Sequence, residues 1–190
     1  MQTKYYPRHV PEGAPAGWVR VMHEVNIPFD RIQKMLAEFS PDLIVELGTK
    51  YGGMTVMFHD ACPEALLYSY DHRDYGDELN NESIHGRDAC ADNVHFMIED
   101  VLNVNQNIVN LLVNYTGKVF LYCDNGNKVE EVHAYAPFLK SGDMLGFHDC
   151  PDEITPEQVA DVLKDYDEHP INEWLVANHY SDRFYVRVVK

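Results

Sequence analysis

Apolar positions recur along this chain at two spacings, and each spacing predicts a type of element. Over 29–39 they fall at every third or fourth residue, which predicts a helix with one buried face. The short apolar run over 43–46 predicts a buried strand. A glycine-rich turn follows, and a second apolar run over 54–58 predicts the start of the next helix.

The same alternation continues to the end of the chain. Short apolar runs that end in an acid predict strands, and amphipathic segments between them predict helices. The segments 173–180 and 184–189, separated by Ser181-Asp-Arg183, predict an antiparallel hairpin. The remaining predicted strands are 66–71, 94–100, 119–124 and 143–149, and the remaining predicted helices are 103–115, 127–139 and 155–166. We therefore expect an α/β fold with a doubly wound, Rossmann-like sheet of seven strands, all parallel except the last.

The chain divides into two parts at residue 28. Residues 1–28 are rich in proline, glycine and aromatic residues and have no lasting period, which predicts an N-terminal arm or lid. Residues 29–190 contain every predicted element and are expected to form one domain. Within this domain the polar, weakly periodic segment 72–93 predicts a long loop or a frayed helix.

Charge narrows the classes of partner that we expect. The formal net charge is −16, and the chain has no cluster of Lys and Arg. Because binding to phosphates depends on such clusters, nucleic acids and anionic membranes are not expected as partners. The chain also has no run of 18 apolar residues and no apolar N-terminal leader, which predicts a soluble, cytoplasmic protein.

The turn after the first predicted strand, Glu46-Leu-Gly-Thr-Lys-Tyr-Gly-Gly53, is the most informative part of the sequence. A glycine turn between a buried strand and a helix is where doubly wound folds bind nucleotide cofactors. A dinucleotide site needs a glycine where this chain has Lys50, and Glu46 would repel a diphosphate. A cofactor with a positive charge and no phosphate, such as S-adenosylmethionine (SAM), suits the turn better. A tight turn that binds nothing is the alternative.

The pattern Glu46-x-Gly48-x-x-x-Gly52-Gly53 resembles the first motif of class I SAM-dependent methyltransferases. The resemblance is greatest to small-molecule and sugar O-methyltransferases related to cephalosporin-hydroxylase-like and rhamnosyl O-methyltransferase proteins. It extends over nearly the whole chain after residue 28 and implies a SAM-binding methyltransferase domain over 29–190. It also implies that the glycines let the backbone approach the methionine part of SAM, and that Glu46 adds negative charge near its amino and sulfonium groups.

Five predicted strands end in an acid, at the edge where ligands of open α/β sheets bind. Each acid alone is also typical of a turn or a helix cap. The resemblance implies that Asp71 accepts hydrogen bonds from the ribose of SAM and that Asp100 lies near the adenine. The full cofactor-binding set that it implies is Glu46, Gly48, Thr49, Gly52, Gly53, Asp71, Asp100 and Asp124.

Asp124, His148 and Asp149 follow the fourth and fifth predicted strands and are candidate metal ligands. In related metal-dependent O-methyltransferases, acids at these places hold a divalent cation, so the resemblance implies a metal site. Mg²⁺ suits one or two carboxylates together with water and substrate oxygens. His148 replaces the carboxylate of several relatives and is also a candidate general base, because its ordinary pKa lies near ~6.5. Helix capping and hydrogen bonding without a metal are the alternative.

Lys128 departs from the related pattern because one extra residue separates it from Asp124. It is either a catalytic group, which orients the substrate or accepts a proton, or a solvated lysine in a first helical turn. His148 and Lys128 are therefore the two candidate catalytic residues.

Together these features predict a SAM-dependent O-methyltransferase, assisted by a divalent cation, that methylates a hydroxyl of a small molecule or glycan. Two alternatives stay open: an NAD-linked oxidoreductase on a similar fold, and a non-catalytic module that binds SAM or a nucleotide. The sequence does not specify the acceptor. The predicted cap is small, which leaves room for the second copy of a homodimer to complete the pocket.

Overall fold

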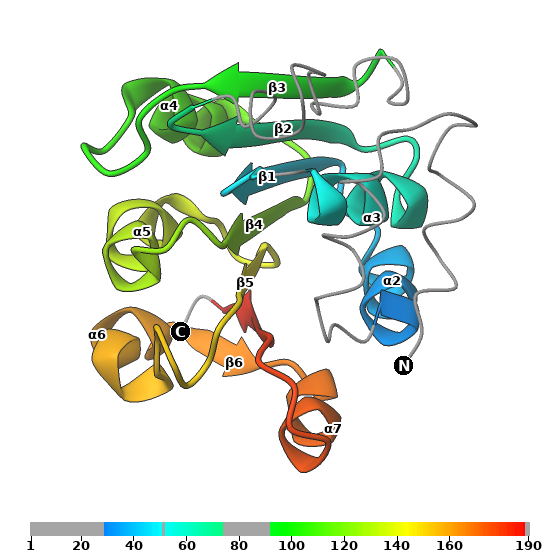
Figure 1. Ribbon diagram of the computed structural model, residues 1–190, viewed down its shortest axis with the longest axis vertical. Coiled ribbons are helices and arrows are strands. Elements are labelled where there is room, and N and C mark those ends of the chain that lie inside the picture. The colour runs from blue at the N-terminus through cyan, green and yellow to red at the C-terminus, as the bar shows by residue number, and fades with distance from the viewer. Residues whose placement is uncertain (1–28, 51, 74–91, 189–190) are drawn as a thin grey trace.

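A sheet of seven strands forms the centre of the computed structural model, which describes residues 29–50, 52–73 and 92–188 (Figure 1). The strands lie in the order β3-β2-β1-β4-β5-β7-β6. In chain order they are β1 Leu43–Leu47, β2 Leu66–Asp71, β3 Val94–Ile98, β4 Val119–Cys123, β5 Met144–Phe147, β6 Tyr166–Glu168 and β7 Arg183–Arg187. Neighbours among β1 to β5 pair in parallel, whereas β7 is antiparallel to both β5 and β6. The predicted α/β class with one reversed strand is confirmed.

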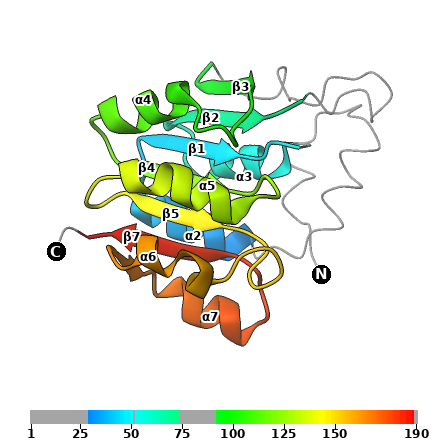
Figure 2. The ribbon, with the colours of Figure 1, turned by 90° about the vertical axis from the view of Figure 1, so that its left-hand side faces the viewer.

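Helices cover both faces of the sheet (Figure 2). On one face lie α4 Gln106–Asn114, α5 Lys128–Tyr135 and α6 Ala160–Leu163, with the 3-10 helices η3 Ala136–Phe138 and η4 Pro156–Val159. On the other face lie α2 Phe29–Phe39, α3 Gly53–Ala61 and α7 Ile171–Ala177. The predicted arm over 1–28 and most of the predicted loop over 72–93 lie outside the described residues. None of the helices that the structure describes is long and apolar enough to cross a membrane.

Strand β1 supplies side chains to two separate cores, because alternate residues of a strand point to opposite faces. Leu43, Val45 and Leu47 pack toward α4 and α5, whereas Ile44 packs toward α2 and α3. All five residues of β1 are buried, and each buried Leu, Ile or Val contributes roughly 1.5–3 kcal/mol. The same alternation directs Glu46 toward the α2 and α3 face, where it lies away from solvent.

The predicted strand over 173–180 is wrong, because these residues form most of α7 and the loop after it. Pro170 precedes the helix, and Asn172 and Leu175, three residues apart, are its buried positions. Leu175 is fully buried, and the guanidinium of Arg31 lies 4.9 Å from the centre of the Trp174 ring. The strand that pairs with β7 is instead β6, which begins at the last residue of the predicted helix over 155–166. The antiparallel pair is therefore present, but α7 connects its two strands.

The chain changes its direction of winding between β1 and β4, which lie side by side although β2 and β3 separate them in sequence. Ligands of doubly wound sheets bind in the crevice beyond such a switch point. Gly48 directly follows β1 and has φ 106°, a conformation that favours glycine. A Cβ atom on Gly48 would overlap the carbonyl of Asp124 and lie 2.8 Å from the amide nitrogen of Asn125. The ends of β1 and β4 therefore meet at a position that only glycine fits.

We expect the Gly48→Ala substitution to destabilise the protein more than Gly142→Ala. Both glycines have positive φ, but a Cβ on Gly142 would meet nothing within 4 Å. Gly142→Ala should thus cost only backbone strain, about 1–3 kcal/mol, whereas Gly48→Ala adds overpacking of about the same size. Urea unfolding of both variants measures the difference. Equal losses would show that the contact with Asp124 imposes no constraint.

Candidate active site

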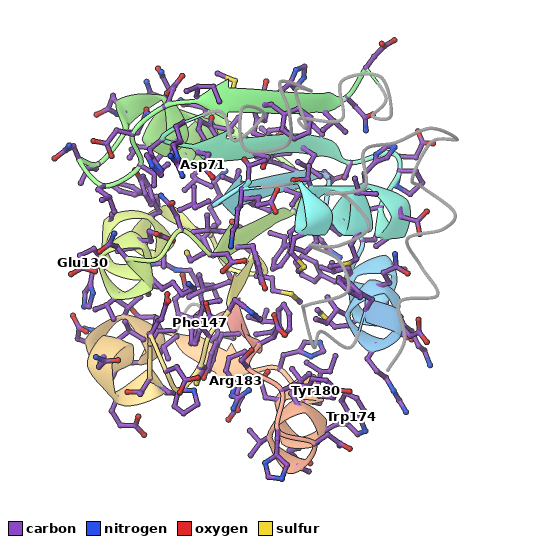
Figure 3. The ribbon with its side chains drawn as sticks, in the orientation of Figure 1. Asp71, Glu130, Phe147, Trp174, Tyr180 and Arg183 are labelled. Atoms are coloured by element: carbon purple, nitrogen blue, oxygen red, sulfur yellow. The ribbon has the colours of Figure 1, made fainter. Side chains whose placement is uncertain are left out.

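Asp71 ends β2 and holds the turn that follows β1 (Figure 3). Its carboxylate accepts hydrogen bonds from the backbone amides of Lys50 and His72, both at 2.7 Å. The Nδ1 atom of His72 lies 2.9 Å from the same carboxylate. Oδ1 thus has both contacts with His72, whereas Oδ2, bound to Lys50, keeps a lone pair that can accept a further hydrogen bond. The predicted contact of Asp71 with a ribose stays a prediction, and its structural role is to fix the turn.

The other residues of the glycine turn lie close to the sheet. Gly52 has φ 72° and donates its amide to the carbonyl of Thr49 at 2.7 Å, and α3 begins at Gly53. The hydroxyl of Thr49 lies 2.6 Å from that of Ser69 on β2, and Thr49 is buried. The Thr49 side chain is therefore part of the support beneath the turn.

Glu46 is fully buried below this turn and accepts hydrogen bonds from the hydroxyls of Ser69, at 2.5 Å, and Thr55. Both hydroxyls bind Oε2, and Oε1 has no partner among the described residues. Burial raises the pKa of Glu46 to about 8, although the two hydroxyls act in the opposite direction. Without a cation nearby, the carboxyl is thus mostly protonated at neutral pH. The expected role of Glu46 as a negative charge near a cofactor stays a prediction.

Asp100 lies in the exposed loop after β3, two residues beyond Ile98, which pairs with Asp71 of β2. Its carboxylate accepts hydrogen bonds from the backbone amide of Leu102 at 2.8 Å and from the side chain of Asn103 at 2.7 Å. These contacts match the turn-forming alternative for this acid. The predicted position of Asp100 near an adenine stays a prediction.

Four predicted residues come together beyond β4 and β5, with a lysine at their centre. Lys128, the first residue of α5, has a side chain that is only 1% exposed. Its Nζ lies 2.9 Å from Asp149 Oδ2, 3.4 Å from Asp124 Oδ1 and 2.6 Å from Glu153 Oε2. We call these three acids and Lys128 the lysine cage. His148, the fourth predicted residue, lies next to it, with Nε2 3.2 Å from Asp149 Oδ1.

The surroundings of Lys128 exclude a solvated lysine and argue against a lysine that accepts a proton. A solvated lysine in the first helical turn is excluded, because the side chain is buried. Burial alone would lower the pKa of Lys128, but Asp124, Glu153 and Asp149 raise it above its ordinary value. Lys128 therefore stays an ammonium at neutral pH and is poorly suited to accept a proton.

His148 pairs with an acid that the sequence did not reveal as a site residue. Its Nδ1 lies 3.1 Å from Oδ1 of Asp182, which is fully buried just before β7. The hydroxyl of Tyr122 donates to the same oxygen at 2.6 Å. Such a carboxylate fixes the orientation of an imidazole and leaves the other nitrogen for chemistry. Here that nitrogen is Nε2, on the side of Asp149.

The loop that carries Asp182 is fixed from two sides (Figure 3). Arg183 donates from Nη1 to the carbonyls of Tyr180, at 2.8 Å, and Asp182, at 2.6 Å. The ring of Tyr180 stacks on that of Trp174 in α7, with 5.3 Å between their centres. Arg183 also pairs with Phe147 across β7 and β5, so Asp182 and His148 lie at the same edge of the sheet.

Opposing effects set the charge of His148 and Asp124. Burial alone would lower the pKa of His148, but the hydrogen bond to Asp182 and the charges of Asp182, Asp124 and Asp149 raise it to about 9. Burial raises the pKa of Asp124 to about 6, while the cations His148 and Lys128 limit the shift. At neutral pH the site therefore contains two cations, His148 and Lys128, among its acids.

The predicted metal ligands are adjacent, but their arrangement does not fit a divalent ion. Mg²⁺ needs oxygen ligands at about 2.0–2.1 Å in octahedral geometry. The ammonium of Lys128 lies between Asp124 and Asp149 and takes both the space and the countercharge that the ion would need. Within 29–50, 52–73 and 92–188, no group of three or more His, Cys, Asp or Glu residues could hold a metal ion.

Two residues of this site, Asp182 and Glu153, were missed by sequence reasoning. Asp182 lies in what was predicted to be a hairpin turn, where an acid is ordinary. Its one usable signal was its position directly before a strand antiparallel to β5, which places it at the carboxyl edge. Glu153 lies four residues after Asp149, and nothing in that spacing indicates a partner for Lys128.

The buried carboxyl of Glu46 should make stability depend on pH. Its folded pKa of about 8 lies above the unfolded value of 4.5, so the stability that it gives is complete below pH 4.5 and is lost as pH rises through about 8. In Glu46→Gln this loss should disappear, an effect of roughly 3–5 kcal/mol between pH 5 and pH 9. Urea unfolding at both pH values tests this, with exposed Glu64→Gln as the control. Parallel pH curves for wild type and Glu46→Gln would contradict it.

Solved structures of methyltransferases share this fold at low sequence identity. A methyltransferase from Geobacter sulfurreducens is 14% identical with a TM-score of 0.61, covering 97% of this chain and 94% of its own. The apo structure of CmcI-N160 is 19% identical with a TM-score of 0.58, and the match covers 85% of this chain and 71% of CmcI-N160. MycE, from the mycinamycin biosynthetic pathway, is 10% identical with a TM-score of 0.58, and the match covers 84% of this chain and 48% of MycE. At these identities the similarity establishes the fold alone.

The chain spans between 45% and 67% of four of the methyltransferase chains that it matches. No curated protein matches it significantly. The family model described as Rhamnosyl O-methyltransferase/CmcI, however, matches residues 21–179, which is most of the sequence. With the SAM motif of the β1 turn and the doubly wound sheet, this match shows that the chain belongs to the Rhamnosyl O-methyltransferase/CmcI family of SAM-dependent methyltransferases.

Proposed function

We propose that this chain transfers a methyl group from SAM to a hydroxyl of a small molecule or sugar. The family description names O-methyl transfer. The observation that carries the proposal is the pair of His148 and Asp182, whose side chains approach to 3.1 Å beside the switch point of the sheet. Once it is neutral, above its pKa of about 9, an oriented imidazole can take the proton that methylation of a hydroxyl releases.

The residues around the glycine turn fit SAM. Gly52 and Gly53 add no side chains at the end of the turn, so a ligand can approach the backbone there, whereas Gly48 faces Asp124. Asp71 Oδ2 keeps a lone pair for a further donor. Glu46 Oε1 has no partner among the described residues, and it becomes an acceptor when a cationic ligand favours the ionised carboxylate. Asp124 adds an acid on the other side of the switch point. This set of acceptors suits a cofactor that has hydroxyl and ammonium donors and no phosphate.

When bound, SAM would supply a methyl group on a cationic sulfur. A bond between the acceptor oxygen and the methyl carbon would form as the carbon–sulfur bond breaks, with S-adenosylhomocysteine (SAH) as the leaving group. His148 accepts the proton of the acceptor hydroxyl at Nε2, because Nδ1 is bound to Asp182. Asp182 is a positioning residue: it holds the ring and stabilises the positive charge that the ring gains. Exclusion of water and alignment of the acceptor at this edge supply the rest of the acceleration.

Assistance by Mg²⁺ stays a prediction, and no step above depends on it. MycE, solved in complex with Mg and SAH, supports it by similarity of fold only. The ammonium of Lys128 between Asp124 and Asp149 opposes it in this chain. The nature of the acceptor is likewise a proposal that rests on the family resemblance. The homodimer is a proposal that rests on the small cap predicted from the sequence.

Calorimetric titration with SAM and with NAD⁺ tests the cofactor. We expect SAM to bind and NAD⁺ not to bind. Asp71→Asn should weaken SAM binding by about 10- to 100-fold, because hydrogen bonds to a charged group contribute about 1.5–3 kcal/mol. Glu130→Gln, on the exposed side of α5 (Figure 3), is the matched control and should bind SAM normally. Binding of NAD⁺ instead of SAM would support the oxidoreductase alternative and refute the proposal.

Formation of SAH with a panel of hydroxylated acceptors tests the role of His148. His148→Gln should lower kcat by about 100- to 10,000-fold without changing the affinity for SAM. Since the pKa of His148 is about 9 under the influence of Asp182, Asp124 and Asp149, the wild-type rate should rise with pH and level off above about pH 9.

His133→Gln, on the solvent side of α5, is the control for His148→Gln and should retain activity. A fully active His148→Gln variant would refute the assignment of the base. A chain that binds SAM but methylates no acceptor, in wild type as in variant, would support the non-catalytic alternative.

A further inference from the structure

The lysine cage brings together acids from two segments, the loop after β4 and the loop between β5 and η4. Asp124 follows β4, Asp149 follows β5, and Glu153 lies in the loop before η4. All three carboxylates contact the Nζ atom of Lys128, at 3.4, 2.9 and 2.6 Å. An ammonium has three N–H donors, so each carboxylate can have one. The lysine is thus fully paired, which is the condition under which a lysine is buried at all.

The backbone after Asp124 positions this ammonium. Asn125, Gly126 and Asn127 separate Asp124 from Lys128, and Gly126 has φ 75° with nothing near its Cβ position. α5 then begins at Lys128 itself, so the side chain starts from the first turn and reaches back under the ends of β4 and β5. Asp149 has φ 56°, which is uncommon for a residue other than glycine and turns its carboxylate toward the same point.

We propose that the ammonium of Lys128 takes the place of a divalent cation in this chain, so that the site works without a bound metal. Three carboxylate groups around one point are the ligand set that a hard divalent cation prefers. In this site a compact, strongly charged ammonium lies at that point instead. The inference deepens the proposed function, because it assigns Lys128 as the positioning residue that holds Asp124 and Asp149 beside His148.

Manganese binding tests this directly, because Mn²⁺ replaces Mg²⁺ at oxygen sites and its EPR signal decreases when the ion is bound. The purified full chain is titrated with Mn²⁺, with and without SAH. Wild type should bind no Mn²⁺ at the cage. Lys128→Met removes the ammonium and leaves the three carboxylates, so it should gain one site at least about tenfold tighter than any wild-type binding.

Matched controls isolate the cage. Lys34→Met removes another lysine with an i,i+4 acid partner, Glu38 at 3.8 Å, but that pair is exposed and should yield no Mn²⁺ site. Adding Asp149→Asn to Lys128→Met should abolish the gained site. Near-UV circular dichroism confirms the fold, and Lys128→Gln, which keeps a donor toward Glu153, replaces Lys128→Met if that variant does not fold.

Two results would overturn the proposal. One is a wild-type Mn²⁺ site that Asp149→Asn removes, since the ion would then bind in spite of Lys128. The other is a folded Lys128→Met variant that binds no Mn²⁺, since the carboxylates would then not form a cation position. SAH titration of the same samples reports the cofactor site separately. Loss of the proposed function, seen as absent SAH binding, is therefore distinguishable from failure of the lysine inference.

Discussion

The backbones of Gly48 and Asp124 touch where β1 and β4 end, and that contact places the glycine turn beside Asp124. The glycine turn, which belongs to the first half of the sheet, is thereby brought beside the charged cluster of the second half. A side chain at position 48 would separate the two halves. The glycine is therefore explained by contact within the chain, before any ligand is considered.

Depth decides which acids at this edge carry charge. Glu46 lies inside β1 and points toward α3, where only the hydroxyls of Ser69 and Thr55 are within reach, so its carboxyl is mostly neutral at pH 7. Asp124 lies one residue beyond β4 and has the cations His148 and Lys128 beside it, so its pKa rises only to about 6. The two acids thus differ in charge because Glu46 lies two residues deeper in the sheet and has hydroxyls rather than cations as neighbours.

The strands from 43 to 147 could be predicted because each is a short apolar run between polar turns, and their parallel order followed from the helices between them. The helix α7 was missed because the segment 173–180 has both helical and strand-like spacing, and only packing of Leu175 against α2 distinguishes them. The acids at the strand ends could be predicted as site candidates because the carboxyl ends of parallel strands lie at the same edge of the sheet.

The contacts of these acids could not be predicted from the sequence, because they join segments far apart along the chain. Asp182 lies 34 residues from His148, and Glu153 lies 25 residues from Lys128. The charge states of Glu46 and Lys128 could not be predicted either, because they depend on burial and on the surrounding groups. Burial and long-range pairing required the folded chain.

Lys128, four residues after Asp124, alone supplies the positive charge at the centre of the cage. The charge at the centre of the cage is encoded by one codon, and the three carboxylates around it come from positions that would not have to change. A single base change at the lysine could thus convert a site with its own cation into one that recruits an ion from the cell. Lineages of this fold could exchange dependence on metal supply for independence from it without rebuilding the sheet.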